Sequence, residues 1–490
     1  MQKDGSILIT ADDFKNGIAD SAILGPARVV NLDLHSKKGV IQLSYNIEEE
    51  SGGEVVGFIS HGTINPKTGT AYFGDDDGNV YRRTAGGTWT LLDNRSFACR
   101  GIQVFEDYLF FVYNTAGDTV TDCYGPLSGS ASWDTAWGVL KNNDTATNVP
   151  SIVSTNGIAY FGINNTLTSL SDSTSSGSIV EGALTLLDAY VVSSLEQVGD
   201  KLQVGTTTDD NTLAVVFPWD RYSTQFELPI NAGLNGVRQL INKDNLLYIA
   251  AGARGDVLIS NTAQTQSIKK ISYLTEDPHG NFNINANAVD THNGGILFGF
   301  GKTAAKYNGP VGVWEYKEKA WSMFTTSNGE CNDNEGLKIG CVMSLGADKY
   351  LVAWERPNST LHSSTYGVDV INNNRRRTNY SGYFDSQLYL VGTTLKEKTF
   401  NTLDFGLAKP LESNCGVKIS YRTNLTDSFT EIDTFAYGTG DKSNNDNLGA
   451  IQNFNFPADI PSCTTVQFRI ALTSPGLNES TPELVYFKAS

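Results

Sequence analysis

The histidines, cysteines and carboxylates of this sequence are the residues whose spacing could create a reactive or metal-binding site. The five histidines stand apart from the six cysteines, and no two cysteines form a C-x-x-C pair. A structural zinc site needs such ligands at short, defined spacings, so we predict no metal site of this kind. We also predict no cofactor, because no phosphate-cradling glycine loop leads into a helix.

The run GDDDGN, residues 74–79, has the carboxylate density of a calcium loop, because Asp75, Asp77 and Asn79 fall at alternate positions. Calcium takes about six to eight oxygen ligands, including a bidentate acid later in the loop. The next acid comes only at Asp93. We therefore favour a tight hairpin turn here over a calcium site.

Ser60 and His61 are adjacent in the sequence, and their side chains are of the kinds that serve as a nucleophile and as a general base. Because neighbouring residues of a strand point to opposite faces, we expect the two side chains to lie apart. The other histidines are equally isolated and are expected at turns or on the surface: His35, His279, His292 and His362. These observations predict a protein that is not an enzyme.

A basic run and two tryptophans are the candidate interaction residues. Arg375, Arg376 and Arg377 are adjacent in an otherwise acidic protein. They could dock onto an acidic neighbouring subunit, a phosphate or a sugar acid, and the alternative is a solvated linker. Trp133 and Trp137 lie in SASWDTAWG. Aromatic residues and arginine dominate interface hot spots, and the alternative for the tryptophans is ordinary core packing.

The charge and the cysteine usage restrict the class of protein. The formal net charge is −17, which argues against nucleic acid and anionic membranes as partners. No window approaches the roughly 20 apolar residues of a membrane span. The acidic start, MQKDGSILITADDF, predicts no secretory signal. The even cysteine count permits bridges such as Cys331 with Cys341, but at this low density we expect reduced thiols.

The elements that must position these residues are short strands that recur along the chain. Seven units share a turn followed by an aromatic-rich apolar run. Their aligned residues stand 37, 51, 42, 45, 50 and 54 positions apart: Tyr72, Leu109, Tyr160, Leu202, Leu247, Leu297 and Leu351. A period of about 40 to 50 residues with several strands per unit is typical of β-propeller blades. We expect five of them to be mostly buried between blades: Tyr72, Tyr160, Leu202, Leu247 and Leu351.

The ends of the chain differ from the repeats. Residues 1–52 predict an N-terminal arm. We expect its strand-like part, Gly39–Ile47, to add a strand to another edge or to reach a neighbouring subunit, and its acidic end EEESGG to be a solvated connector. Residues 53–385 predict the propeller of seven blades. In residues 386–490 the runs GVKISYRT and TVQFRIALTS alternate apolar with polar residues, which predicts an antiparallel β-sandwich. The expected fold class is all-β.

The order of these parts resembles virion structural proteins of tailed bacteriophages. The opening of phage tail-associated propellers is similar to the lead-in DFKNGIADSAILGPARVVNLDLHSKKGV. Tail accessory or nozzle-type factors carry a sandwich beside the propeller. The C-terminal part of this chain is similar to that sandwich, from LYLVGTTLKEKTFNTLDF through VKISYRT and VQFRIALTS to the final P-E-L strand. The resemblance implies a structural adaptor in the virion tail or neck, made in the host cytoplasm. Its partners would be copies of itself, other tail or neck proteins, and a host surface glycan. No functional residue is carried over from it.

A second resemblance supports the alternative function. TAGGTWTLL, residues 84–92, resembles part of the aspartate box of sialidase blades, without the serine and aspartate of the consensus. In that family the box is structural, and the chemistry needs an arginine cluster and a tyrosine activated by a glutamate. No such pairing can be assigned from this sequence. A polysaccharide-binding or polysaccharide-degrading propeller is therefore the alternative to the structural adaptor.

Overall fold

The protein is almost entirely β-structure in the computed structural model. The model describes residues 6–16, 27–34, 37–50, 53–208, 212–234, 236–251, 256–260, 265–267, 282–292, 294–302, 312–317, 320–327, 336–346, 348–356, 366–376, 381–393, 396–412, 415–436, 452–474 and 481–490. Within these residues the only helices are two 3₁₀ segments, η1 (Ala11–Asn16) and η2 (Ser176–Ser178). The predicted all-β class is confirmed.

The chain divides into two compact units, and each is built from separate segments. The repeat unit comprises Glu48–Val313 and Thr326–Val370. The terminal unit comprises Met1–Ile47, Trp314–Thr325 and Ile371–Ser490. The sequence predicts three continuous segments, 1–52, 53–385 and 386–490, whereas each compact unit combines several segments. The boundaries of the three segments stay a prediction.

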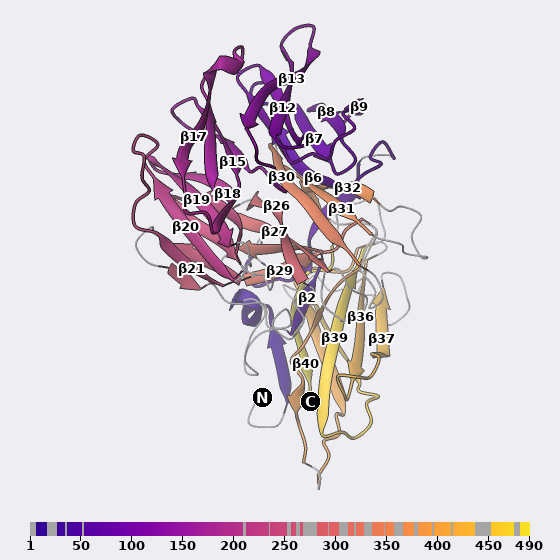
Figure 1. Ribbon diagram of the computed structural model, residues 1–490. Coiled ribbons are helices and arrows are strands. Elements are labelled where there is room, and N and C mark those ends of the chain that lie inside the picture. Colours follow the sequence, from indigo (N-terminus) through magenta and orange to yellow (C-terminus); the bar gives the residue numbers. More distant parts are fainter. Residues whose placement is uncertain are drawn as a thin grey trace. The chain divides into compact units, whose positions relative to one another are not determined.

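Five sheets of the repeat unit each contain four strands that follow one another in sequence and pair in that order (Figure 1). They are β6 (Ile59–Ile64), β7 (Ala71–Asp75), β8 (Asn79–Arg83) and β9 (Trp89–Asn94); β10 (Gly101–Phe105), β11 (Tyr108–Asn114), β12 (Thr119–Gly125) and β13 (Ser132–Lys141); β14 (Ser151–Val153), β15 (Ala159–Ile163), β16 (Thr166–Leu170) and β17 (Ile179–Thr185); β18 (Tyr190–Val198), β19 (Lys201–Thr208), β20 (Leu213–Trp219) and β21 (Ile230–Leu234); β22 (Val237–Lys243), β23 (Leu246–Ala251), β24 (Asp256–Ser260) and β25 (Thr265–Ser267). Consecutive four-stranded antiparallel sheets are the pattern of β-propellers.

Two further strand groups continue this series. One begins with β26 (Phe282–His292), which pairs with β27 (Gly295–Lys302). The other has the order β30 (Lys338–Gly346), β31 (Lys349–Glu355), β32 (Tyr366–Arg376) and β5 (Tyr45–Glu49). The predicted pairing of the lead-in with a distant sheet edge is therefore confirmed for β5, which lies beside β32.

The seven aligned repeat residues all occupy the second strand of their group. These strands are β7, β11, β15, β19, β23, β27 and β31. Each aligned residue is at most 5% exposed. Strands that are covered on both faces are apolar at nearly every position, which is why the repeat could be recognised in the sequence. The predicted burial of Tyr72, Tyr160, Leu202, Leu247 and Leu351 is confirmed.

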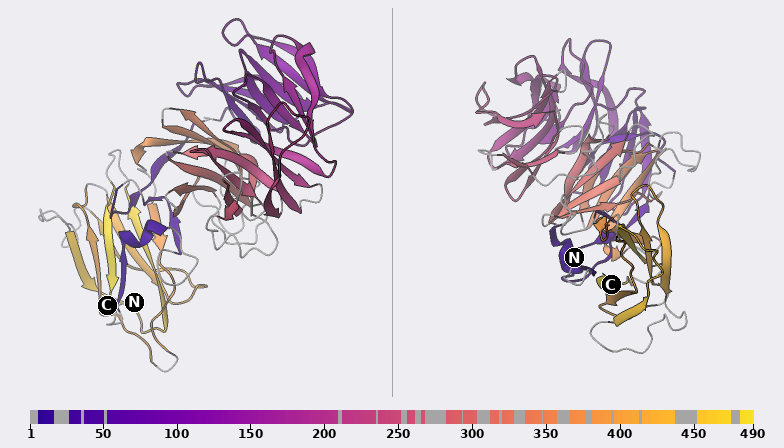
Figure 2. Two further views of the ribbon diagram at one scale, coloured as in Figure 1. Left: turned by 90° about the vertical axis from the view of Figure 1, so that its left-hand side faces the viewer. Right: turned by 90° about the horizontal axis from the view of Figure 1, so that it is seen from below.

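The apolar cores of the repeat unit lie between neighbouring sheets. Phe110 and Phe161, from the second and third sheets, belong to one core cluster. Leu202, of the fourth sheet, shares a cluster with Tyr160. The last sheet packs in the same way on the first, because Leu351 shares a cluster with Phe73. The last sheet of the series therefore packs on the first, and Figure 2 shows the same strands from two further sides.

Glycines in the second strands allow this close packing. A Cβ atom built on Gly162 of β15 would lie 2.4 Å from a methyl of Val192, in the next sheet. A Cβ atom on Gly299 of β27 would lie 2.3 Å from Ile339. Contacts this short do not occur between carbon atoms, so any side chain here would push two sheets apart. This explains why the repeated runs contain glycine.

The acidic connector after β5 is held by a buried ion pair, so the expectation of a solvated EEESGG is wrong for Glu50. Its carboxylate accepts hydrogen bonds from Arg83 Nε at 2.5 Å and Nη2 at 2.7 Å, and from the indole of Trp89 at 3.3 Å. Arg83 is 1% exposed. A buried guanidinium needs such a counter-charge because leaving it unpaired is costly. Glu50 also donates its backbone N–H to the carbonyl of Val368, in β32.

The GDDDGN run forms a hairpin turn, in agreement with the favoured prediction. Asp75 accepts backbone hydrogen bonds from Asp77 and Asn79 and side-chain hydrogen bonds from Asn79 and Tyr81. Gly78 adopts a φ of +84°, which suits glycine in a tight turn. The oxygens of Asp75 are therefore engaged within the turn.

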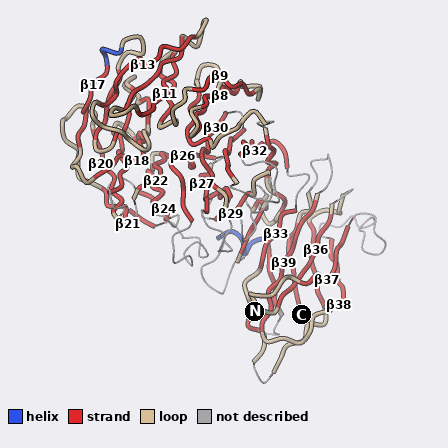
Figure 3. Tube along the Cα trace, turned by 45° about the vertical axis from the view of Figure 1, so that its right-hand side comes forward, coloured by secondary structure: helices blue, strands red, loops and turns tan. Residues whose placement is uncertain are grey.

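The terminal unit contains two main sheets (Figure 3). The first has the order β1 (Ile7–Thr10), β40 (Leu484–Ala489), β35 (Thr402–Leu407) and β38 (Gln452–Pro457). The second includes β29 (Ala320–Phe324), β2 (Arg28–Val30), β33 (Ser381–Asp385), β39 (Thr465–Thr473), β36 (Gly416–Arg422) and β37 (Thr430–Ala436). β28 (Gly312–Lys317) is the strand next to β29 in the order of this sheet, and the two-residue strands are β3 (Leu32–Asp33), β4 (Gln42–Leu43) and β34 (Tyr389–Leu390).

Aromatic side chains join these two sheets. Phe405 of β35 lies edge-on to Phe435 of β37, with ring centroids 4.9 Å apart. Phe468 of β39 contacts Phe487 of β40 at 5.0 Å. All four rings are buried. The alternating residues that predicted a one-sided strand, such as Val466, Phe468 and Ile470, therefore face this aromatic core.

Candidate functional site between the first strands

A cavity of about 330 Å³ lies between the first strands of the repeat unit. Its walls come from β6, β14, β18, β22, β26 and β30. Its lining includes Ser151, Glu196, Gln239, Asn242, Asn287, Asp290 and Thr291. None of its lining residues in the described part of the chain is Lys, Arg or His. The cavity therefore combines two carboxylates with several amides and no basic side chain.

A wide bulge in β26 shapes this cavity. Ile284 pairs with Phe300 and Val289 with Phe298, so four residues of β26 lie opposite one residue of β27. Within the bulge, Asn287 has a φ of +67°. Its side chain donates a hydrogen bond to the carbonyl of Ser60 at 3.1 Å, and its backbone N–H donates to Gln239 at 3.2 Å. The bulge thus links three sheets beside the cavity.

Ser60 and His61 form a hydrogen bond, so the expectation that they lie apart is wrong. Ser60 Oγ lies 2.8 Å from His61 Nδ1, and His61 Nε2 lies 2.8 Å from Asn148 Oδ1. The reason is a bulge in β6, where Ile59 pairs with Asp75 but His61 already pairs with Gly74. A bulge breaks the alternation of faces on which the expectation rested.

The histidines that the structure describes, His61 and His292, are buried, against the expectation of turn or surface positions. Burial lowers the pKa of His61 to about 4, and the hydrogen bond to Asn148 opposes this only in part. His61 is therefore neutral near pH 7. His292 packs edge-on against Tyr350, with ring centroids 4.3 Å apart. His35, His279 and His362 lie outside the described residues.

The two carboxylates of the cavity are held by backbone groups. Asp290 accepts hydrogen bonds from the N–H of Thr291 and of Ser344, both at 2.6 Å. Glu196 accepts one from the N–H of Gln197 at 2.9 Å. Burial, and then the charge of Asp290, raise the pKa of Glu196 to about 7. Burial also raises the pKa of Asp290. Removal from water and mutual repulsion both favour the neutral form of such a pair.

Trp133 and Trp137, the predicted interaction residues of β13, pack against the sheet beneath them. Trp137 lies edge-on to Phe110 at 5.0 Å. Trp133 stacks between Tyr124 at 4.9 Å and the guanidinium of Arg95 at 4.6 Å. Both are half-buried. These contacts agree with the core alternative, and their role at an interface stays a prediction.

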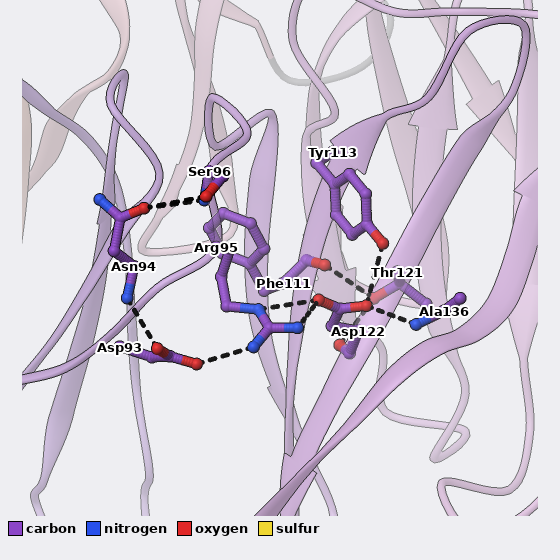
Figure 4. Close-up of polar contacts among 9 residues, drawn as sticks. All are labelled: Asp93, Asn94, Arg95, Ser96, Phe111, Tyr113, Thr121, Asp122 and Ala136. Carbon is purple, nitrogen blue, oxygen red and sulfur yellow. Dashed lines mark hydrogen bonds and ion pairs between the residues drawn. The ribbon is translucent and has the colours of Figure 1, made fainter.

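Arg95 belongs to a polar cluster around Asp122 (Figure 4). It bridges Asp93 at 2.7 Å and Asp122 at 2.5 Å. Asp122 also accepts hydrogen bonds from Tyr113 and from the backbone N–H of Ala136. Sequence reasoning did not single out this cluster, because its members come from four separate segments and form no motif.

The arginine run cannot be placed as a site. Arg375 and Arg376 belong to the backbone of β32, but their side chains and all of Arg377 lie outside the described residues. Of the cysteines, Cys99, Cys123, Cys341, Cys415 and Cys463 are buried, and no disulfide joins any two of these five described residues. Cys331 lies outside the described residues. The reduced state of the thiols stays a prediction.

The terminal unit carries a row of alternating cations and rings on its second sheet: Arg28, Tyr383, Arg469, Phe429 and Arg422. Arg469 lies 4.0 Å from the centroid of Tyr383 and 4.2 Å from that of Phe429. Arg422 lies 4.6 Å from Phe429 on its other side. Such cation–π contacts stabilise by about 0.5–2 kcal/mol each. Beside Arg422 opens a cleft of about 320 Å³ whose walls include Thr423, Ser462 and Thr465.

Comparison with known proteins gives similarity of structure only. No family model matches the chain, and no curated protein matches it. The computationally designed protein Ika8 is similar over 70% of this chain and 96% of its own, at 13% identity and a TM-score of 0.40. The Neurospora crassa Pan2 WD40 domain is similar over 70% and 98%, at 9% identity and a TM-score of 0.44. Chaetomium thermophilum Raptor is similar over 68% of this chain and 30% of its own, at 12% identity and a TM-score of 0.46.

A membrane-spanning helix was also sought. In the described segments no helix has the length and apolar character that crossing a membrane requires.

Proposed function

We propose that the repeat unit is a seven-bladed β-propeller and that the terminal unit contains a β-sandwich. Two observations support seven blades: each of seven strand groups carries one aligned residue in its second strand, and the last sheet shares a core with the first. The aromatic contacts between the two sheets of the terminal unit support the sandwich. An experimental structure with six or eight blades would contradict the count.

We propose that the protein is a non-enzymatic structural component of a phage virion, an adaptor in the tail or neck that contributes to recognition of the host surface. The observation that carries this proposal is that segments from the start of the chain complete sheets formed much later: β5 lies beside β32, and β1 pairs with β40. Such closure makes stiff bodies suited to repeated contact with copies of the chain and with neighbouring tail proteins. The order of the chain's parts resembles that of phage virion proteins. This resemblance is the reason why we propose the tail or neck of a virion as the place of assembly.

Purified virions provide the test of this function. Mass spectrometry and cryo-electron microscopy of particles from the phage that encodes the chain should detect it in a fixed copy number at the tail or neck. Particles made without it should lack a complete tail or fail to attach. Its absence from purified particles that infect normally would refute the virion role.

Polysaccharide binding is a second candidate function, and the row of arginines and rings in the terminal unit favours it. The cleft beside this row is lined by Arg422, Glu397 and Asp427 together with hydroxyl groups such as those of Thr423 and Ser462, and these groups suit hydrogen bonding to a sugar chain. A glycan array probed with the protein separates the candidates. Retention of bacterial polysaccharides without cleavage favours recognition, whereas release of reducing ends would establish a degrading enzyme.

A further inference from the structure

The cavity between the first strands carries negative charge without a counter-charge in its lining. Glu196 and Asp290 come from β18 and β26, with β22 between these strands in the series. The other polar lining residues are neutral: the amides Gln239, Asn242 and Asn287 and the hydroxyl residues Ser151 and Thr291. Like charges enclosed together are unfavourable unless a cation joins them or one is protonated. The lining is therefore complementary to a positively charged ligand.

An unpartnered amide lies directly behind Glu196. Gln203 of β19 is opposite Glu196 in the ladder, so the two side chains stand on the same face of the sheet. Gln203 is fully buried, and neither its amide nitrogen nor its amide oxygen has a hydrogen-bond partner. Native structures rarely leave such atoms unsatisfied, and a water or ligand group is a common explanation. Gln203 is not part of the cavity lining, but its amide lies beside Glu196 on the same face of the sheet.

The size of the cavity and its ligating groups indicate the kind of cation. About 330 Å³ is roughly ten times the volume of one water molecule in the liquid and lies at the lower end of ligand pockets, which begin near 300 Å³. Both oxygens of Asp290 already accept hydrogen bonds from backbone N–H groups. In the described chain no three His, Cys, Asp or Glu residues gather as a metal site. These features suit an organic cation better than a bare metal ion.

We propose that this cavity binds a small organic cation, a primary ammonium group on a polar body about the size of an amino sugar. Glu196 and Asp290 supply the counter-charges for the ammonium group. The amides of Gln239 and Asn242 supply hydrogen bonds for hydroxyl groups on the ligand body. Gln203 joins the site through a bridging water or a shift of its side chain toward Glu196. This binding site is additional to the structural role and does not depend on it.

Titration calorimetry with the full chain at pH 7, where most of the glucosamine carries its ammonium charge, tests the proposal. The probes are glucosamine, glucose, calcium chloride and magnesium chloride. We expect glucosamine to bind and glucose, which has the same body without the amine, to bind at least tenfold more weakly. Glu196→Gln keeps the shape of the side chain and should weaken glucosamine binding at least tenfold. Glu54→Gln, at an exposed position of the same unit, is the matched control and should leave binding unchanged.

A variant with an added negative charge should bind glucosamine more tightly, and a misfolded protein could not give that result. Gln239→Glu keeps the oxygen that accepts from Asn287 and adds a third negative charge to the cavity. It should strengthen glucosamine binding about fivefold if Coulomb attraction dominates. Circular dichroism of each variant checks the fold. Equal binding of glucose and glucosamine, no binding of glucosamine at all, or binding of calcium or magnesium alone would each overturn the proposal.

Discussion

At the scale of single residues, the protein relies on buried charged groups with fixed partners. Arg83 with Glu50 and Arg95 with Asp122 are ion pairs in which at least one member is almost fully buried. Each pair joins segments that are not neighbours in the sequence. Removing one partner leaves the other as an uncompensated charge in a low-dielectric setting. These pairs therefore fix which segments meet, more than they add to net stability.

Replacing Arg83 with Met should lower the free energy of unfolding by about 3–5 kcal/mol, because it leaves the carboxylate of Glu50 half-buried and unpaired. Urea denaturation followed by tryptophan fluorescence measures the loss. Lys201→Met is the control, because the pair of Lys201 with Glu227 is partly exposed and should be worth at most about 1 kcal/mol. Similar losses for the two variants would contradict the importance of burial.

The pH dependence of stability should contain two opposing contributions. His61 has a folded pKa of about 4 against an ordinary value of 6.5, so its contribution is present above pH 6.5 and is lost as the pH falls toward 4. Glu196 has a folded pKa of about 7 against 4.5, so the folded state loses stability as the pH rises from 4.5 to 7. The two slopes partly cancel between pH 4.5 and 6.5.

Glu196→Gln removes the contribution of Glu196 to the pH dependence of stability and should leave that of His61. We expect this variant to be more stable than the parent by about 1–3 kcal/mol at pH 8, and the advantage to vanish near pH 4.5. Urea denaturation at the two pH values measures the difference. Glu54→Gln, at an exposed position, should change stability by less than about 0.5 kcal/mol at both. An advantage that is independent of pH would show that Glu196 does not titrate in this range.

At the scale of elements, second strands with glycines set the distance between sheets. Gly162→Val should lower the free energy of unfolding by about 1–3 kcal/mol or more, because its side chain would overlap Val192 of the next sheet. Gly117→Ala is the control, since no atom lies within 4 Å of the added Cβ. Thermal unfolding of the two variants, with circular dichroism in the folded state, decides between them. An unchanged Gly162→Val protein would mean that the sheets can separate at little cost.

The sequence predicted these elements well, and their bulges poorly. The five aligned residues that we expected to be buried, Tyr72 and Leu351 among them, are buried, because a strand covered on both faces must be apolar along its length. Ser60 with His61 and the cavity around Asn287 were missed, because a bulge shifts the register without leaving a pattern in the sequence. Glu196 and Asp290 were missed because their proximity depends on sheets that are far apart in the chain.

At the scale of the whole molecule, the pairing of the N-terminal strand β5 with β32 should determine whether the protein stays soluble. Deleting residues 1–50 removes β5 from the edge of β32 and Glu50 from Arg83. An exposed strand edge invites pairing with other chains, so we expect the truncated protein to aggregate. Light scattering of the purified protein measures this, with deletion of residues 1–5 as the control. A monodisperse truncated protein would show that closure of the sheets does not require the lead-in.

The pairing of β1 with β40 also has a consequence for biosynthesis. Ile7 lies opposite Ala489, and Thr10 opposite Tyr486, so β1 pairs with a strand that is translated much later than β1 itself. At about 5–20 residues per second, translation of the intervening chain takes roughly half a minute or more. During that time β1 has no strand partner in its own sheet, whereas the four-stranded sheets of the repeat unit can form one after another as they emerge. The sheet that contains β1 is therefore completed only after β40 has been translated, and a chain that stalls before β40 would present the unpaired strand β1 to the chaperones of the cell.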